Sequence, residues 1–166
     1  MLDAARSASV PIIFTVIEYD PDDSRGPWEL KHSRMHGALP SGSEATELDP
    51  WLGHLPNEKL LVKKYTSCFR GTNLYQILAG LEVDTLIVTG CSTSHCVNDT
   101  CRDDTCRDGM SSFRMIVAEE AVGGPCEILH LAELLDLDAF AADVLSTEEV
   151  VAYLNRLPVA DAPQLA

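Results

Sequence analysis

The residue best placed for covalent chemistry is a cysteine where strand-like sequence gives way to helix-like sequence. Cys96 closes the segment GCSTSHC (residues 90–96), which follows the apolar run TLIVT. At such a corner, the free N–H groups and the dipole of a helix start stabilise a thiolate, the nucleophilic form of cysteine. The same N–H groups can receive the oxyanion of a tetrahedral intermediate. The position indicates an acyl-transfer nucleophile, with a packed small residue as the alternative.

A second candidate lies at the end of the preceding apolar run. Lys63 and Lys64 close the segment KLLVKK (residues 59–64). Adjacent strand residues point to opposite sides, so only one of the two ammonium groups can reach a crevice beside Cys96. A cation there would further favour the thiolate. The alternative for this pair is a solvated strand end.

The elements that must position these residues alternate along the chain. The predicted strands are residues 10–17, 59–64, 85–89, 113–117 and 143–145. The predicted helices are residues 73–81, 96–108, 126–140 and 146–157, the last with Ser146 and Glu149 in capping-box register. This alternation predicts an α/β fold with a mostly parallel sheet and helices on both faces. Ligands bind such sheets beyond the carboxyl ends of the strands.

Residues 18–58 predict a long excursion between two of these strands. The segment is rich in Pro, Gly, Asp and Ser, and its prolines interrupt any periodicity. Loops of this length in compact domains are usually functional or mobile. The excursion is therefore expected to be either functional or mobile.

Composition excludes several classes of partner. The formal net charge is −14, from 12 Lys and Arg against 26 Asp and Glu, and the cations are scattered. Such a chain repels nucleic acid and anionic membrane surfaces. No segment approaches the roughly 20 apolar residues of a membrane span, and the start lacks the pattern of a secretory signal. We expect one domain, a cytoplasmic location, and no nucleic-acid or membrane partner.

The six cysteines predict free thiols rather than a disulfide framework. Four of them recur every five residues, at Cys91, Cys96, Cys101 and Cys106. This spacing makes neighbours diverge around a helix, and the chain has no CxxC pair for a structural zinc. Small packed side chains are favoured over a metal or cluster.

Four segments resemble the isochorismatase-like cysteine hydrolases. KKYTSCFRGTNL (residues 63–74) is similar to the family pattern of a lysine, three spacers and Ser-x-Phe-x-Gly-Thr-x-Leu, and this register selects Lys63. TLIVTGCSTSHCV (85–97) resembles its nucleophile strand and turn, with Thr100 one helical turn later. EAVG (120–123) and DVLSTEEVVAYL (143–154) also match. The resemblance covers residues 1–157, leaving 158–166 as a tail, and is greatest to the N-carbamoylsarcosine amidase branch.

The resemblance implies a Rossmann-like three-layer α/β/α sandwich and an Asp-Lys-Cys triad. Cys96 would attack a carbonyl carbon, Lys63 would hold the charge arrangement, and the N–H groups of Ser92 and Cys96 would form the oxyanion hole beside a cis Cys91–Ser92 peptide. Family members that cleave a vinyl ether lack this cysteine, so its presence implies hydrolysis of a small amide or carbamoyl (ureido) compound. The family also implies no cofactor or metal, and a homo-oligomer of two or four chains.

The sequence departs from the family at the triad acid. The family's aspartate ends a strand that would precede the first segment of this chain, and Asp3 falls instead in what resembles the following helix. The fold is therefore expected to be N-terminally truncated, with unpaired sheet edges. An inactive or truncated protein that acts as a binding or assembly subunit is the alternative function. Gly124 and Pro125 also replace the usual Asp-Arg after EAVG.

Other polar and aromatic residues receive weaker assignments. His95 adjoins the candidate nucleophile but projects in a different direction, which favours a pocket wall over a Cys-His pair. Tyr19 and Trp28 lie in the excursion, where they either line the pocket or pack the loop onto the core. His32 and His36 are interpreted as surface residues rather than metal ligands.

Overall fold

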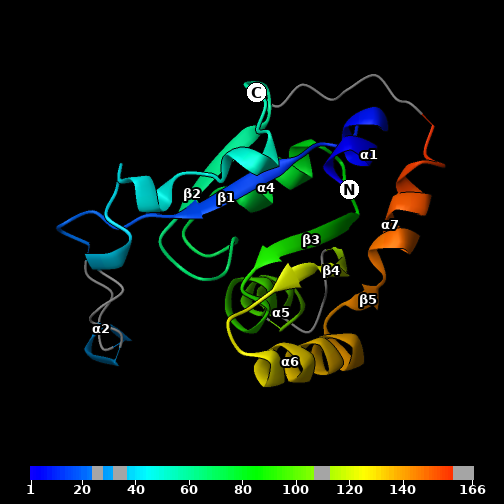
Figure 1. Cartoon of the computed structure of the whole chain (residues 1–166). Coiled ribbons are helices and arrows are strands. Elements are labelled where there is room, and N and C mark those ends of the chain that lie inside the picture. The colour runs from blue at the N-terminus through cyan, green and yellow to red at the C-terminus, as the bar shows by residue number, and fades with distance from the viewer. Residues whose placement is uncertain (24–27, 32–36, 107–112, 159–166) are drawn as a thin grey trace.

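Strands and helices alternate in the computed structural model, as the sequence predicts (Figure 1). It describes residues 1–23, 28–31, 37–106 and 113–158. The strands are β1 (Ile13–Ile17), β2 (Lys59–Lys63), β3 (Thr85–Cys91), β4 (Arg114–Gly123) and β5 (Asp143–Leu145). The α-helices are α1 (Leu2–Ser7), α2 (Trp28–Lys31), α4 (Leu74–Gly80), α5 (Asn98–Cys106), α6 (Glu127–Phe140) and α7 (Thr147–Leu154). Single turns are η1 (Glu44–Thr46), η2 (Pro50–Leu52) and the π-helical η3 (Thr93–Val97).

All the strand pairs are parallel, but the strands divide between two sheets. β1 pairs with β2, and β3, β4 and β5 form the second sheet in that order. The α/β fold with parallel strands is confirmed, but the alternation of strands and helices predicted one sheet where the structure has two. Within the described residues no strand joins β1 to β3.

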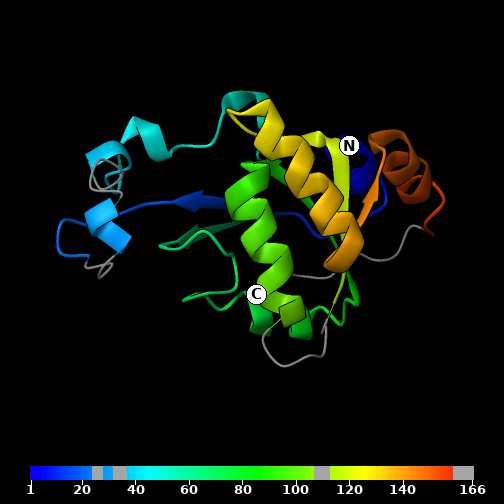
Figure 2. The ribbon, with the colours of Figure 1, turned by 90° about the horizontal axis from the view of Figure 1, so that it is seen from below.

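The helices cover both faces of the second sheet because β4 alternates its side chains. Met115 and Val117 pack into a core cluster with residues of α4, α5 and α6. Ile116 and Ala118 point the other way, into a cluster with residues of α1 and α7. Figures 1 and 2 show α5 and α6 side by side on one side of this sheet, with α1 and α7 on the other. The result is three layers.

Several boundaries differ from the prediction for local reasons. β4 continues to Gly123, beyond the predicted end at residue 117, because the polar segment after Ala118 still pairs with β3. Helical structure begins at Thr93, before Cys96, and α5 ends at Cys106. Residues 107–112 and most of the predicted tail lie outside the described residues. The Ser146 and Glu149 capping box is confirmed, and its helix α7 ends at Leu154.

The excursion between β1 and β2 is anchored at both ends. Near its start, Tyr19 donates its N–H to Leu39 O (2.9 Å) and accepts from Ser41 N (3.0 Å). Near its end, Glu58 receives two bonds from the guanidinium of Arg6 in α1, at 2.8 and 3.0 Å. Arg6 also donates to Gly53 O at 2.9 Å, so one side chain fixes the end of the excursion to the first helix.

The Arg6–Glu58 pair predicts a pH-dependent contribution to stability. The hydrogen bonds from Arg6 are the main cause that lowers the pKa of Glu58. A carboxyl with a lowered folded-state pKa stabilises the fold above its unfolded pKa of about 4.3, and this stability is lost as the pH falls through the folded-state pKa. We expect Arg6→Gln to lower Tm at pH 7, and we expect its difference from the unmodified chain to shrink below pH ~4.

Thermal melts between pH 3 and 8 check this, with Arg156→Gln as the matched control. Arg156 is exposed, and no ion pair to it is seen in the described part of the chain. A Tm difference for Arg6→Gln that is the same at pH 3 and pH 7 contradicts the role of the pair.

Candidate active site

The turn after β3 places Cys96 in the first turn of helical structure, which begins at Thr93 and not at Cys96 as the sequence predicted. Cys96 is partly exposed and lies in η3, whose N-cap residue is Ser92. The carbonyl of Ser92 accepts hydrogen bonds from His95 N (3.1 Å) and Val97 N (3.2 Å). The Cys91–Ser92 peptide is cis, which agrees with the expectation from the resemblance. The thiol therefore sits on a compact turn beyond the carboxyl end of a parallel strand.

Thr100 connects this turn to the loop that follows β2. Its hydroxyl donates to the carbonyl of Cys96 (2.6 Å) and accepts from the N–H of Cys68 (3.1 Å). Thr100 is itself buried. A side chain one turn after Cys96 thus fixes the backbone of the candidate nucleophile against a loop distant in sequence.

Lys63 is the inward-facing member of the lysine pair. It is the register partner of Ile17 at the end of β2, and it is only 2% exposed. Its Nζ donates to the carbonyls of Tyr65 (3.1 Å) and Thr66 (2.6 Å), and no described residue gives it a carboxylate partner. Lys64 points elsewhere and pairs with Asp20 (2.7 Å) and Asp23 (3.0 Å). A buried ammonium held by neutral carbonyls alone is an uncompensated charge.

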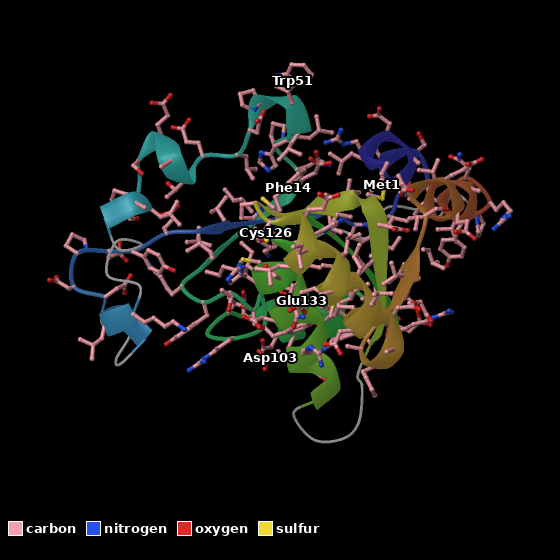
Figure 3. The ribbon with its side chains drawn as sticks, turned by 60° about the horizontal axis from the view of Figure 1, so that its bottom comes forward. Met1, Phe14, Trp51, Asp103, Cys126 and Glu133 are labelled. Atoms are coloured by element: carbon pink, nitrogen blue, oxygen red, sulfur yellow. The ribbon has the colours of Figure 1, made fainter. Side chains whose placement is uncertain are left out.

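The loop that receives this ammonium is bonded to α5 by side chains. The hydroxyl of Thr66 donates to Asp99, and that of Ser67 donates to Asp103 at 2.7 Å. Asp103 is labelled on α5 in Figure 3. The arrows of β1 and β3 point the same way in Figure 1, so the carboxyl ends of both sheets lie on one side of the molecule. The structure thereby joins the elements that carry Lys63 and Cys96.

The remaining predicted site residues have different environments. His95 is exposed, with Nδ1 3.1 Å from Ser94 Oγ. Tyr19 is buried at 3% exposure, and its role as a pocket wall stays a prediction. Trp28 begins α2, but its side chain lies outside the described residues, as do His32 and His36.

Two expected absences can be compared with the described part of the chain. No group of three or more potential metal ligands occurs among the described residues. None of the described helices has the length and apolar character needed to cross a bilayer. Asp3 lies in α1 with its side chain fully exposed, and its Oδ1 is 3.6 Å from Nη1 of Arg6.

Sequence reasoning missed a contact between α6 and the nucleophile turn. Thr93 Oγ1 lies 2.8 Å from Nδ1 of His130. The available signal was a single histidine within the apolar run ILHLAELL, on the face that α6 also uses to bury Leu134 and Leu137. Such a residue is more often part of the core, and only the tertiary contact distinguishes it.

Comparison with known proteins identifies relatives of this chain. The isochorismatase domain matches residues 1–149. The chain is 32% identical over 160 residues to an N-carbamoylsarcosine amidase from an Arthrobacter species, covering 94% of this chain and 59% of that relative. It is 30% identical over 159 residues to a maleamate amidohydrolase from Pseudomonas putida, covering 95% of this chain and 72% of the relative. The chain therefore spans about three fifths of the length of the first of these relatives.

Solved structures show the same fold. A cysteine hydrolase from Pseudomonas syringae pv. phaseolicola superimposes with a TM-score of 0.85 at 23% identity, over 95% of this chain and 78% of that chain. A nicotinamidase/pyrazinamidase from Bacillus subtilis does so with a TM-score of 0.69 at 23% identity, over 86% of this chain and 79% of that one. With the domain match over residues 1–149, these likenesses show that the chain belongs to the isochorismatase family.

Proposed function

We propose that the chain hydrolyses a C–N bond of a small amide or carbamoyl compound, with Cys96 as the nucleophile. The observation that carries the proposal is the partly exposed thiol on a strand-to-helix turn, fixed by Thr100 to the loop that binds the Lys63 ammonium. The two amidases among the relatives support this reaction type. Their names favour it over the inactive binding or assembly subunit.

The proposed reaction proceeds through a covalent intermediate. The Cys96 thiolate forms a C–S bond to the substrate carbonyl carbon, whose oxygen takes the negative charge and is received by N–H groups of the turn, assigned to Ser92 and Cys96. The C–N bond then breaks, and the amine or ammonia leaves with the proton that the Cys96 thiol gave up when it formed the thiolate. Water attacks the resulting thioester, the C–S bond breaks, and the thiol is regenerated with release of the carboxylic or carbamic acid.

Lys63 contributes charge to this cycle. A buried ammonium favours the anionic form of a nearby thiol and the anionic intermediate. In the family this ammonium faces the triad aspartate, and none of the described residues is assigned that role. The proposal therefore also requires a base, a carboxylate in the family, that accepts the Cys96 proton and passes it to the leaving nitrogen.

We expect Cys96→Ala to reduce kcat/KM by at least about a thousandfold, because the covalent path is lost. Ammonia release from N-carbamoylsarcosine and maleamate, the compounds named in the two relatives, is the measurement. Cys126→Ala is the matched control, since Cys126 is an exposed free thiol at the start of α6. Hydrolysis that persists in Cys96→Ala sinks the proposal.

We expect Lys63→Gln to lower kcat/KM by roughly a hundredfold, since the charge that favours the thiolate is removed. The adjacent Lys64→Gln removes a similar charge from the same strand end, where it faces Asp20 and Asp23. We expect the kcat/KM of that control to stay within about threefold of the value for the unmodified chain. Equal losses in the two variants would show that general charge, rather than the buried ammonium, determines the rate.

A further inference from the structure

The turn that carries Cys96 has a side-chain anchor on a neighbouring helix. Thr93 is the first residue of η3 and has no exposed surface. Its Oγ1 lies 2.8 Å from His130 Nδ1, which is the only hydrogen bond of this hydroxyl within the described chain. A buried hydroxyl that loses its partner costs free energy, so the two side chains constrain each other.

This anchor acts on the segment that matters for the proposed chemistry. Thr93 lies directly after Ser92, whose carbonyl closes the turn, and three residues before Cys96. Movement of Thr93 therefore moves the N–H groups assigned to the oxyanion together with the thiol. In neutral His130, Nδ1 accepts a hydrogen bond from the Thr93 hydroxyl in the Nε2–H tautomer and donates one to the hydroxyl oxygen in the Nδ1–H tautomer. Imidazolium also donates from Nδ1, so the pair stays bonded in each state.

Helix α6 provides a rigid base for His130. Leu134 and Leu137 of α6 are buried in the core. Two further side chains of the same helix bond to α5, where Asn98 donates to Glu133 and Arg102 pairs with Asp136. Figure 3 shows Glu133 on α6 facing α5. Three polar side chains along α6 thus contact neighbouring elements. Glu133 and Asp136 contact α5, whereas His130 contacts the turn that carries Cys96.

From this arrangement we propose that His130 is a positioning residue: through Thr93 it holds the Cys96 turn in the geometry that stabilises a thiolate. The inference rests on the proposed function in that Cys96 is taken as the reactive thiol. The rival interpretation is that the histidine only fills space between α6 and η3. In that case, any side chain of similar volume at position 130 would serve equally well.

The test measures the reactivity of Cys96 and does not need a substrate. The full chain is alkylated with iodoacetamide at pH values from 5 to 9, and the rate at Cys96 is obtained by peptide mass mapping. Four variants are compared. His130→Leu and Thr93→Val remove the hydrogen bond while keeping approximate volume. His130→Asn and Thr93→Ser keep a polar partner at nearly the same place.

We expect His130→Leu and Thr93→Val each to slow alkylation of Cys96 at pH 7 about tenfold and to shift its pH profile upward, as loss of one buried hydrogen bond implies. His130→Asn and Thr93→Ser should stay within about threefold. The double variant His130→Leu/Thr93→Val should react no more slowly than either of its single variants, because each single substitution already removes the same contact. Glu133→Gln, a matched change one turn away, should leave the profile unchanged.

Three results would overturn the proposal. These are an unchanged pH profile in His130→Leu and Thr93→Val, equal slowing in His130→Asn and His130→Leu, or additive losses in the double variant. If the leucine variant does not melt cooperatively, Thr93→Val against Thr93→Ser decides in the same way. The proposed function fails in a different experiment. Hydrolysis that survives Cys96→Ala contradicts the proposed function, but it does not test the coupling between His130 and the reactivity of Cys96.

Discussion

The buried ammonium of Lys63 is the constraint on which the candidate site depends. A charge that is 2% exposed must be solvated by the protein, and here the carbonyls of Tyr65 and Thr66 do so. Those carbonyls belong to a loop that Ser67 and Thr66 bond to α5. The need to solvate one cation therefore fixes the loop, and the loop connects β2 to the helix that follows Cys96.

Several acidic side chains connect elements of the fold, in addition to contributing negative charge. Glu58 binds α1 to the end of the excursion, Asp103 fixes the loop after β2, and Asp136 binds α5 to α6. A net charge of −14 repels other anions at long range, yet each of these carboxylates has a local donor. Composition predicts which classes of partner are repelled, but it could not indicate which acids have structural roles.

The sequence predicted elements whose signals are local, and it missed those that depend on tertiary contacts. β5 and the capping box at Ser146 appear as expected, since three residues or one turn suffice to define them. The extension of β4 through charged residues follows from pairing with β3, and no apolar pattern encodes it. Cys96 and the lysine pair were proposed as site residues from their places at strand ends, and the family resemblance selected Lys63 from the pair. His130 was not proposed, because its contact with the turn depends on which helix packs against η3.

The division into two sheets has a consequence for how the molecule opens. β1 and β2 exchange backbone hydrogen bonds only with each other among the described strands, and side-chain packing joins them to the second sheet, for example through Leu61 and Ile13. Two sheets that share no ladder of backbone hydrogen bonds can separate when the packing contacts between them are lost together. We therefore expect amides of β1 and β2 to exchange with deuterium as a group, at a lower opening free energy than those of β4.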